Sequence, residues 1–63
     1  MDNVEFLTVL QLADRLGVHP QTLARWRRNN QGPRFTKTEH PVRILYPVFE
    51  VEIFEKAHPL IKD

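Results

Sequence analysis

The sequence predicts a small, mainly α-helical domain that carries one small β-hairpin. Apolar residues recur at helical spacing on both sides of Gly17, which indicates two short helices. After Gly32-Pro33 the pattern changes to β-branched, aromatic and basic residues, and Pro47 then opens another helical stretch. These changes predict two helices, a hairpin and a final helix, in that order.

Length and composition predict a single folded domain with a small core. The chain has 63 residues, of which 41% are hydrophobic, so disorder is not expected. We expect one domain over residues 1–63, with residues 1–5 and 60–63 frayed at its ends. The absence of cysteine excludes disulfides and is typical of a reducing compartment. The acidic start and the lack of about 20 consecutive apolar residues predict neither a signal peptide nor a membrane span.

The first helix is expected to begin after Thr8 and to end at Gly17. Thr8 and Gln11 have the spacing of a capping box, in which each side chain bonds the backbone of the other residue. Four apolar residues then form a stripe for burial: Val9, Leu12, Ala13 and Leu16. Glycine suits the left-handed position that ends a helix, so Gly17 is expected to stop this one.

The second helix is predicted to begin at His19-Pro20 and to have two different faces. Proline at the first helical position loses no needed hydrogen bond, and the three residues from Gly17 form a tight turn. On a projection at about 100° per residue, one side holds Leu23, Trp26 and Asn30. The opposite side holds Gln21, Arg25 and Arg28, with Thr22 on a flank. Such a helix can pack against a core and contact a ligand at once.

A two-stranded hairpin and a last helix are predicted to follow. Residues 34–37 and 42–46 read as strands, and the segment between them lacks an Asn-Gly turn, so a loop of more than two residues is expected. The last helix is expected between Pro47 and Pro59. Its inward side is predicted to hold Val51, Phe54, Ala57 and His58.

Charge is strongly divided along the chain, although the net charge is only +1. Between Arg25 and Arg43 six basic residues stand against the single acid Glu39, whereas the rest of the chain has three basic and seven acidic residues. A basic segment on a nearly neutral protein favours a polyanion that approaches from one side.

The order of the predicted elements is that of a winged helix-turn-helix, and the residues resemble one family with this fold. The segments that carry the resemblance are Phe6-Leu7-Thr8, Leu12-Ala13, Leu16-Gly17-Val18, Thr22-Leu23, Arg25-Trp26-Arg27, Gly32-Pro33, Val42-Arg43, Tyr46-Pro47 and Glu50-Val51-Glu52. Over about residues 6–57 the chain is similar to the excisionase-type branch of the MerR superfamily, which includes small AlpA-type phage regulators.

The resemblance implies a role for each part of the predicted surface. The second helix would enter the major groove of DNA, and the hairpin would contact the adjacent backbone or minor groove. Base readout would fall to Gln21, Arg25 and Arg28. Backbone contacts or capping would fall to His19, Thr22 and Arg27. The wing contacts would be Lys37, Thr38, His40 and Arg43, and Trp26 would brace the helix.

The resemblance also implies a biological setting. Members of this size are excisionases, which direct recombination of phages and mobile elements, or transcriptional regulators, and both act on cytoplasmic, nucleoid-associated DNA. They often occupy repeated sites as several protomers, so self-association and an integrase are the expected protein partners. The members that sense metals or drugs carry a further module, so no cofactor, metal or small-molecule effector is expected here.

Three departures from the family pattern bear on these expectations. His19 stands where serine or threonine is common, so the second helix has an unusual cap that could itself reach a phosphate. Glu39 and Pro41 stand in a wing that commonly carries glycine, and a glutamate disfavours insertion into the minor groove. Phe49 and Ile53 add an apolar edge, for which packing into the core or as a hydrophobic staple is the main expectation and self-association the alternative.

Two other classes of function are the alternatives to DNA binding. Catalysis is not expected, because His19, His40 and His58 are far apart and no nucleophile stands near a base in the sequence. The alternative is a protein-interaction module that keeps the fold and contacts an integrase or polymerase without reading DNA.

Overall fold

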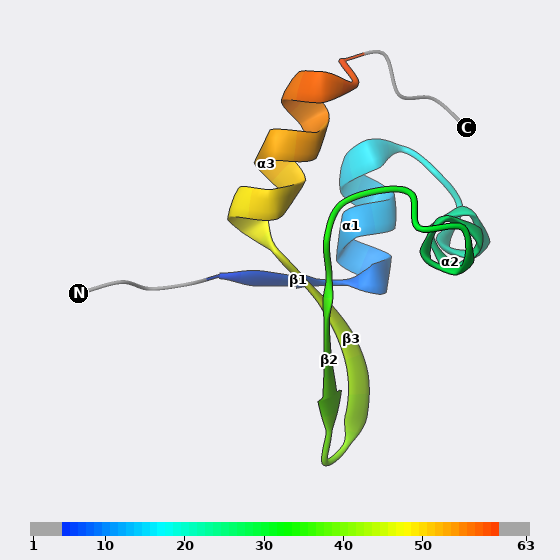
Figure 1. Cartoon of the computed structure of the whole chain (residues 1–63), viewed down its shortest axis with the longest axis vertical. Coiled ribbons are helices and arrows are strands. Elements are labelled where there is room, and N and C mark those ends of the chain that lie inside the picture. The colour runs from blue at the N-terminus through cyan, green and yellow to red at the C-terminus, as the bar shows by residue number, and fades with distance from the viewer. Residues whose placement is uncertain (1–4, 60–63) are drawn as a thin grey trace.

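Three helices and three antiparallel strands make up residues 5–59, the part of the chain that the computed structural model describes (Figure 1). In chain order the elements are β1 (Phe6–Thr8), α1 (Val9–Leu16), α2 (Pro20–Arg28), β2 (Thr36–Glu39), β3 (Val42–Pro47) and α3 (Val48–Ala57). The fold is mixed α/β. It confirms the three predicted helices and the hairpin, and it adds a strand, β1, that the sequence pattern does not predict.

The predicted fraying concerns residues that lie largely outside the described part of the chain. Only Glu5 can be compared with it, and its carbonyl accepts a hydrogen bond from the Val48 N–H at 2.9 Å. This bond joins the residue before β1 to the first residue of α3. None of the helices within residues 5–59 is long and apolar enough to span a membrane.

Both ends of α1 form as the sequence predicts. Thr8 Oγ1 accepts from the Gln11 N–H at 3.1 Å, and Gln11 Oε1 accepts from the Thr8 N–H at 2.9 Å, which completes the capping box. Gly17 ends the helix in the left-handed conformation (φ 72°). The next N–H, of Val18, donates to the Ala13 carbonyl at 3.0 Å, and this turn leads the chain into α2.

The sheet has the strand order β1-β3-β2, so β3 is the central strand. Leu7 of β1 pairs with Tyr46, and Lys37 of β2 pairs with Ile44. β1 has only three residues, too few to show an alternating pattern, and it forms because β3 offers backbone hydrogen-bonding groups along its other edge.

The tip of the hairpin is tighter than expected. Glu39 pairs with Val42, so only His40 and Pro41 form the turn. The peptide bond between them is cis, as in type VI turns, and Thr38 Oγ1 donates to the Pro41 carbonyl at 2.7 Å. The prediction of a longer loop is wrong because a proline-based turn closes the hairpin in place of a glycine-based one. The first strand also begins at Thr36, two residues later than predicted.

The core lies where α1, α2 and α3 meet one face of the sheet. Its fully buried large side chains, one from each of α1, α2, β3 and α3, are Leu12, Leu23, Tyr46 and Val51. Each such burial stabilises the fold by about 1.5–3 kcal/mol. Arg15 of α1 adds a two-bond ion pair with Glu55 of α3, with N–O distances of 3.0 Å. The hydrogen bond with Glu55 raises the pKa of Arg15.

The outer side of α3 differs from expectation. Val51 is buried and Phe54 is half-buried, as predicted, but Ala57 and His58 are exposed. Phe49 and Ile53, one turn apart, are 53% and 60% exposed. The expectation that they pack into the core is wrong, because Val51 already fills the inward position and the other two point away from it.

The segment 29–35 carries the chain from α2 back to the sheet. α2 ends at Arg28, so Asn30, predicted on the buried side, instead lies in the segment, exposed and in the left-handed conformation (φ 56°). The Gln31 N–H donates to the Trp26 carbonyl at 2.7 Å, which holds the segment against the end of the helix. Gly32, with φ 85°, packs beneath the Trp26 ring.

Gly17→Ala and Gly32→Ala are expected to lower the free energy of unfolding by different amounts. Both positions have left-handed backbone, so alanine is strained at either one by about 1–2 kcal/mol. A Cβ at Gly17 would meet nothing within 4 Å, whereas a Cβ at Gly32 would lie 2.8 Å from Trp26 Cε3. We expect Gly32→Ala to lower the free energy of unfolding in urea by about 1–3 kcal/mol more than Gly17→Ala does. Equal losses would contradict the packing of Trp26 on Gly32.

Candidate nucleic-acid interface

The solvent-facing side of α2 carries three long side chains capable of hydrogen bonding. Gln21, Arg25 and Arg28 are all exposed, whereas Leu23 on the opposite side is completely buried. Their positions on the helix fall within about 60° of arc, so the three side chains leave the helix in one direction. The sequence-based division of this helix into two faces is confirmed for these four residues.

His19 caps α2 by an unusual bond. Its Nδ1 accepts from the Gln21 N–H at 3.0 Å, so the imidazole replaces the serine or threonine oxygen that caps most helices. With Nδ1 as the acceptor, the neutral ring carries its hydrogen on Nε2. His19 is exposed at the start of the helix, where a donor and the positive end of the helix dipole favour an anion.

Thr22 does not lie on the accessible flank that was predicted for it. It is only 5% exposed and packs beside Leu23 in the interior. This burial contradicts the prediction that Thr22 contacts phosphate. The side-chain cap given by the structure is that of His19. The buried face of α2 is wider than its apolar residues alone indicate, because a threonine can be buried when its hydroxyl has a hydrogen-bond partner.

Arg27 connects α2 to the sheet. Its Nη1 donates to the Tyr46 hydroxyl at 2.7 Å, and its guanidinium carbon lies 5.8 Å from the centre of the Phe35 ring. The Phe35 and Tyr46 rings are themselves in tilted contact, with 6.0 Å between centroids. The side chain is half-buried and held in place, so Arg27 has a structural role that its predicted backbone contact did not include.

The predicted wing residues do not share one face of the hairpin. Paired residues lie on the same face, so Lys37 projects with its partner Ile44, and Arg43 projects with Thr38 from the other face. The Thr38 hydroxyl hydrogen is committed to the Pro41 carbonyl inside the turn. His40 is exposed at the tip. The wing therefore offers one cation on each face and an imidazole at its end.

Charge is separated in space as it is in the sequence. All six basic residues between positions 25 and 43 lie on α2, the segment 29–35 or the hairpin. Three of the acidic residues, Glu50, Glu52 and Glu55, lie on α3. Figure 1 shows α3 at the opposite end of the molecule from the hairpin tip. The six cations therefore lie on α2 and on the segments that directly follow it, and the three acids of α3 lie away from the hairpin tip.

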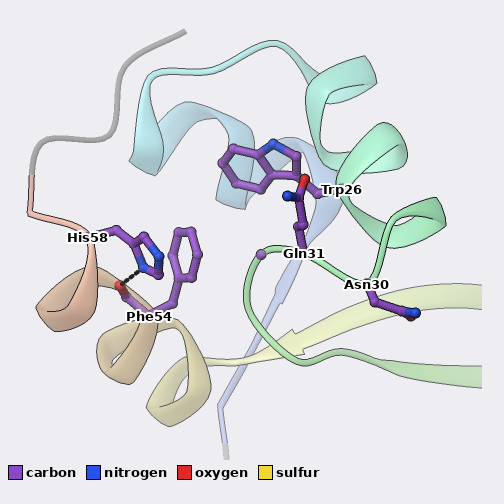
Figure 2. A pocket seen from close by; sticks show the side chains of 6 residues that line it. Trp26, Asn30, Gln31, Phe54 and His58 are labelled. Atoms are coloured by element: carbon purple, nitrogen blue, oxygen red, sulfur yellow. Dashed lines mark hydrogen bonds between the residues drawn. The ribbon is translucent and has the colours of Figure 1, made fainter.

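An aromatic hollow of about 440 Å³ lies between the end of α2 and α3 (Figure 2). Trp26 and Phe54 meet across it with ring centroids 5.6 Å apart, and His58 stacks on Phe54 at 4.4 Å. These rings fix α2 against α3, and Trp26 also packs against the core cluster. The resemblance implies that Trp26 braces α2 against the core and the wing, and these contacts bear out the core part of that role. Among residues 5–59 no cluster of three histidine, aspartate or glutamate side chains could hold a metal ion.

Comparisons of the chain with protein-family models, with curated proteins and with solved structures find no match. The chemistry, exposure and charge of its own side chains are therefore the basis for inferring its function. The residues that sequence reasoning missed are Phe35 and Tyr46, which hold Arg27, and Arg34, which lies beside them in the segment. Their roles depend on contacts between distant elements, and no local pattern marks them.

Tyr46→Phe is expected to lower the free energy of unfolding by about 1–2 kcal/mol. The change keeps the buried ring and removes only the hydroxyl that accepts from a charged donor. Water can replace part of the lost bond because Arg27 is half exposed. Urea unfolding of Tyr46→Phe, Arg27→Met and the double variant measures the coupling between the two residues. Additive losses in this cycle would show that the bond does not stabilise the fold.

Proposed function

We propose that the chain is a sequence-specific double-stranded DNA-binding protein of the winged helix-turn-helix class. One observation carries the proposal: Gln21, Arg25 and Arg28 project together from a helix whose other side is locked into the core. In this proposal α2 enters the major groove, and the hairpin lies along the adjacent backbone. The six cations on α2, the segment 29–35 and the hairpin supply the attraction to phosphate that such binding needs.

The chemistry of the three exposed residues suits the edges of bases. The major groove is wide enough for an α-helix, and it presents a different pattern of donors and acceptors for each base pair. Arginine can donate two hydrogen bonds to guanine O6 and N7, and glutamine can pair with adenine N6 and N7. The three-residue turn between α1 and α2 matches the arrangement in which the second helix is the one that reads DNA.

The hairpin is proposed to contact backbone and not to penetrate deeply into the minor groove. Lys37 and Arg43 lie on opposite faces, so a hairpin set over a groove would present one cation to each bordering strand. Glu39 stands next to the tip and is exposed, and its charge repels phosphate. The wing is thus suited to holding the domain in register while α2 supplies specificity.

Two biological uses fit the same surface. An excisionase would place several protomers on repeated sites and bend the DNA, whereas a transcriptional regulator needs only to occupy a promoter. The exposed Phe49 and Ile53 favour protein contacts during either use. The same pair of residues supports the second candidate function, a module that contacts an integrase or polymerase without reading DNA.

Affinity for duplex DNA is expected to fall steeply with salt. About five phosphate contacts predict a slope of −4 to −5 for log K against log salt concentration. Fluorescence anisotropy with a labelled duplex over about 50–200 mM salt measures this slope. A chain that binds neither random duplex nor its native operator at low salt would leave the protein-contact function as the better explanation.

Variants of α2 are expected to change the sequence specificity of DNA binding, whereas variants of the wing are expected to change its overall affinity. Arg25→Ala or Arg28→Ala should remove about 1–3 kcal/mol of discrimination at a single base position, because each change deletes one base contact. Lys37→Ala or Arg43→Ala should weaken binding to all sequences alike. Selection from a random duplex pool, followed by affinity measurements on single-base variants, separates the two effects. If wing and α2 variants relaxed specificity equally, the proposed division of roles would be wrong.

A further inference from the structure

A basic hollow lies along the segment 29–35, which joins α2 to the hairpin. Its volume is about 410 Å³, and we call it the joint hollow. The residues that line it include Arg27, Asn30, Gln31, Arg34 and Phe35. The sequence prediction assigned no ligand to this place, and neither Arg34 nor Asn30 was among the predicted DNA contacts.

The joint hollow is built to favour an anion. Two arginines, Arg27 and Arg34, are among the residues that line it, and none of the described aspartates or glutamates is. Arg34 is exposed, and no carboxylate of residues 5–59 pairs with it, in contrast to Arg15, which pairs with Glu55. Guanidinium groups bind phosphate oxygens with two parallel hydrogen bonds. The chemistry of the hollow therefore matches a phosphate group.

One of the two arginines is already held in place. The Tyr46 hydroxyl accepts from Arg27 Nη1 at 2.7 Å, and the Phe35 ring lies 5.8 Å from the guanidinium carbon. Tyr46 is buried in the core, so the position of Arg27 is fixed by the fold. An anion that binds beside Arg27 would meet an oriented donor, which reduces the cost of ordering a long side chain.

The place of the hollow in the fold suggests which phosphate it binds. If α2 lies in the major groove and the hairpin lies over the next groove, the DNA strand that separates the two grooves must cross the joint between them. We propose that the joint hollow binds a backbone phosphate of this strand, with Arg34 as its direct ligand and Arg27 beside it. This inference rests on the proposed DNA binding and adds to it a defined phosphate site.

The first test compares Arg34→Gln with Lys56→Gln, a matched loss of one charge on α3. Both residues are exposed, so both variants should keep the circular dichroism spectrum and unfolding midpoint of the wild type. With a duplex selected by the wild type, Arg34→Gln should weaken binding roughly tenfold and reduce the salt slope by about 1, at unchanged sequence preference. Lys56→Gln should stay within about twofold of the wild type, because its charge is remote from the proposed surface.

The second test locates the phosphate itself. A series of duplexes is made in which each carries one neutral methylphosphonate linkage. We expect one linkage, between the base positions read by α2 and those under the hairpin, whose neutralisation weakens the wild type roughly tenfold but weakens Arg34→Gln much less, because only Arg27 is then left beside it. Tyr46→Phe loosens Arg27 without removing a charge. It should weaken binding to the unmodified duplex, and neutralising the same linkage should then weaken binding by Tyr46→Phe less than it weakens binding by the wild type.

The outcomes separate this inference from the proposed function. The phosphate site is wrong, while DNA binding stands, if the wild type binds DNA but Arg34→Gln behaves like Lys56→Gln. The same conclusion follows if neutralising each linkage weakens Arg34→Gln as much as it weakens the wild type. If the wild type binds no duplex at low salt, both proposals are overturned. A single coupled linkage at the predicted place supports both.

Discussion

The position of α2 depends on the burial of Tyr46, near the end of the central strand β3. Its ring lies in the core with Leu23, and its hydroxyl accepts a hydrogen bond from Arg27, so the central strand holds α2 by apolar contact and by a charged donor. On the other edge of the strand, Tyr46 pairs with Leu7 of β1. The sheet and α2 therefore converge on one residue, and a change there would shift α2 relative to the hairpin.

This arrangement explains how one nine-residue helix can serve both the core and a ligand. Leu23 and Thr22 are buried, Trp26 packs on Phe54 and Gly32, and the arc that remains holds Gln21, Arg25 and Arg28. Because the buried side cannot rotate without opening the core, the direction of the exposed side chains is fixed before any ligand arrives. Little backbone ordering is then left to oppose binding.

Local chemistry made part of the fold predictable. Thr8 with Gln11, Gly17 and Pro20 act through their own backbone neighbours, so α1 and the start of α2 follow from sequence alone. The remaining features depend on contacts between distant segments. β1 forms only because β3 lies beside it, Thr22 is buried only because the core extends past the apolar stripe, and Phe49 is exposed only because Val51 fills the inward position. The candidate site is also predictable only in part. The exposed face of α2 follows from helical periodicity, whereas the pairing of Arg27 with Tyr46 does not.

A helix with three base-reading side chains needs its register on DNA to be fixed by other contacts. A single small module buries roughly 600–1,000 Å² on DNA, which limits how much selectivity it can reach alone. In the proposed complex the joint hollow holds the backbone beyond the last turn of α2, and the hairpin holds it further along. These phosphate contacts restrict sliding and tilting of the helix. A mismatched base then leaves an arginine or glutamine unpaired, because the helix cannot shift to avoid the mismatch. The specificity of Gln21, Arg25 and Arg28 would then depend on residues that touch no base.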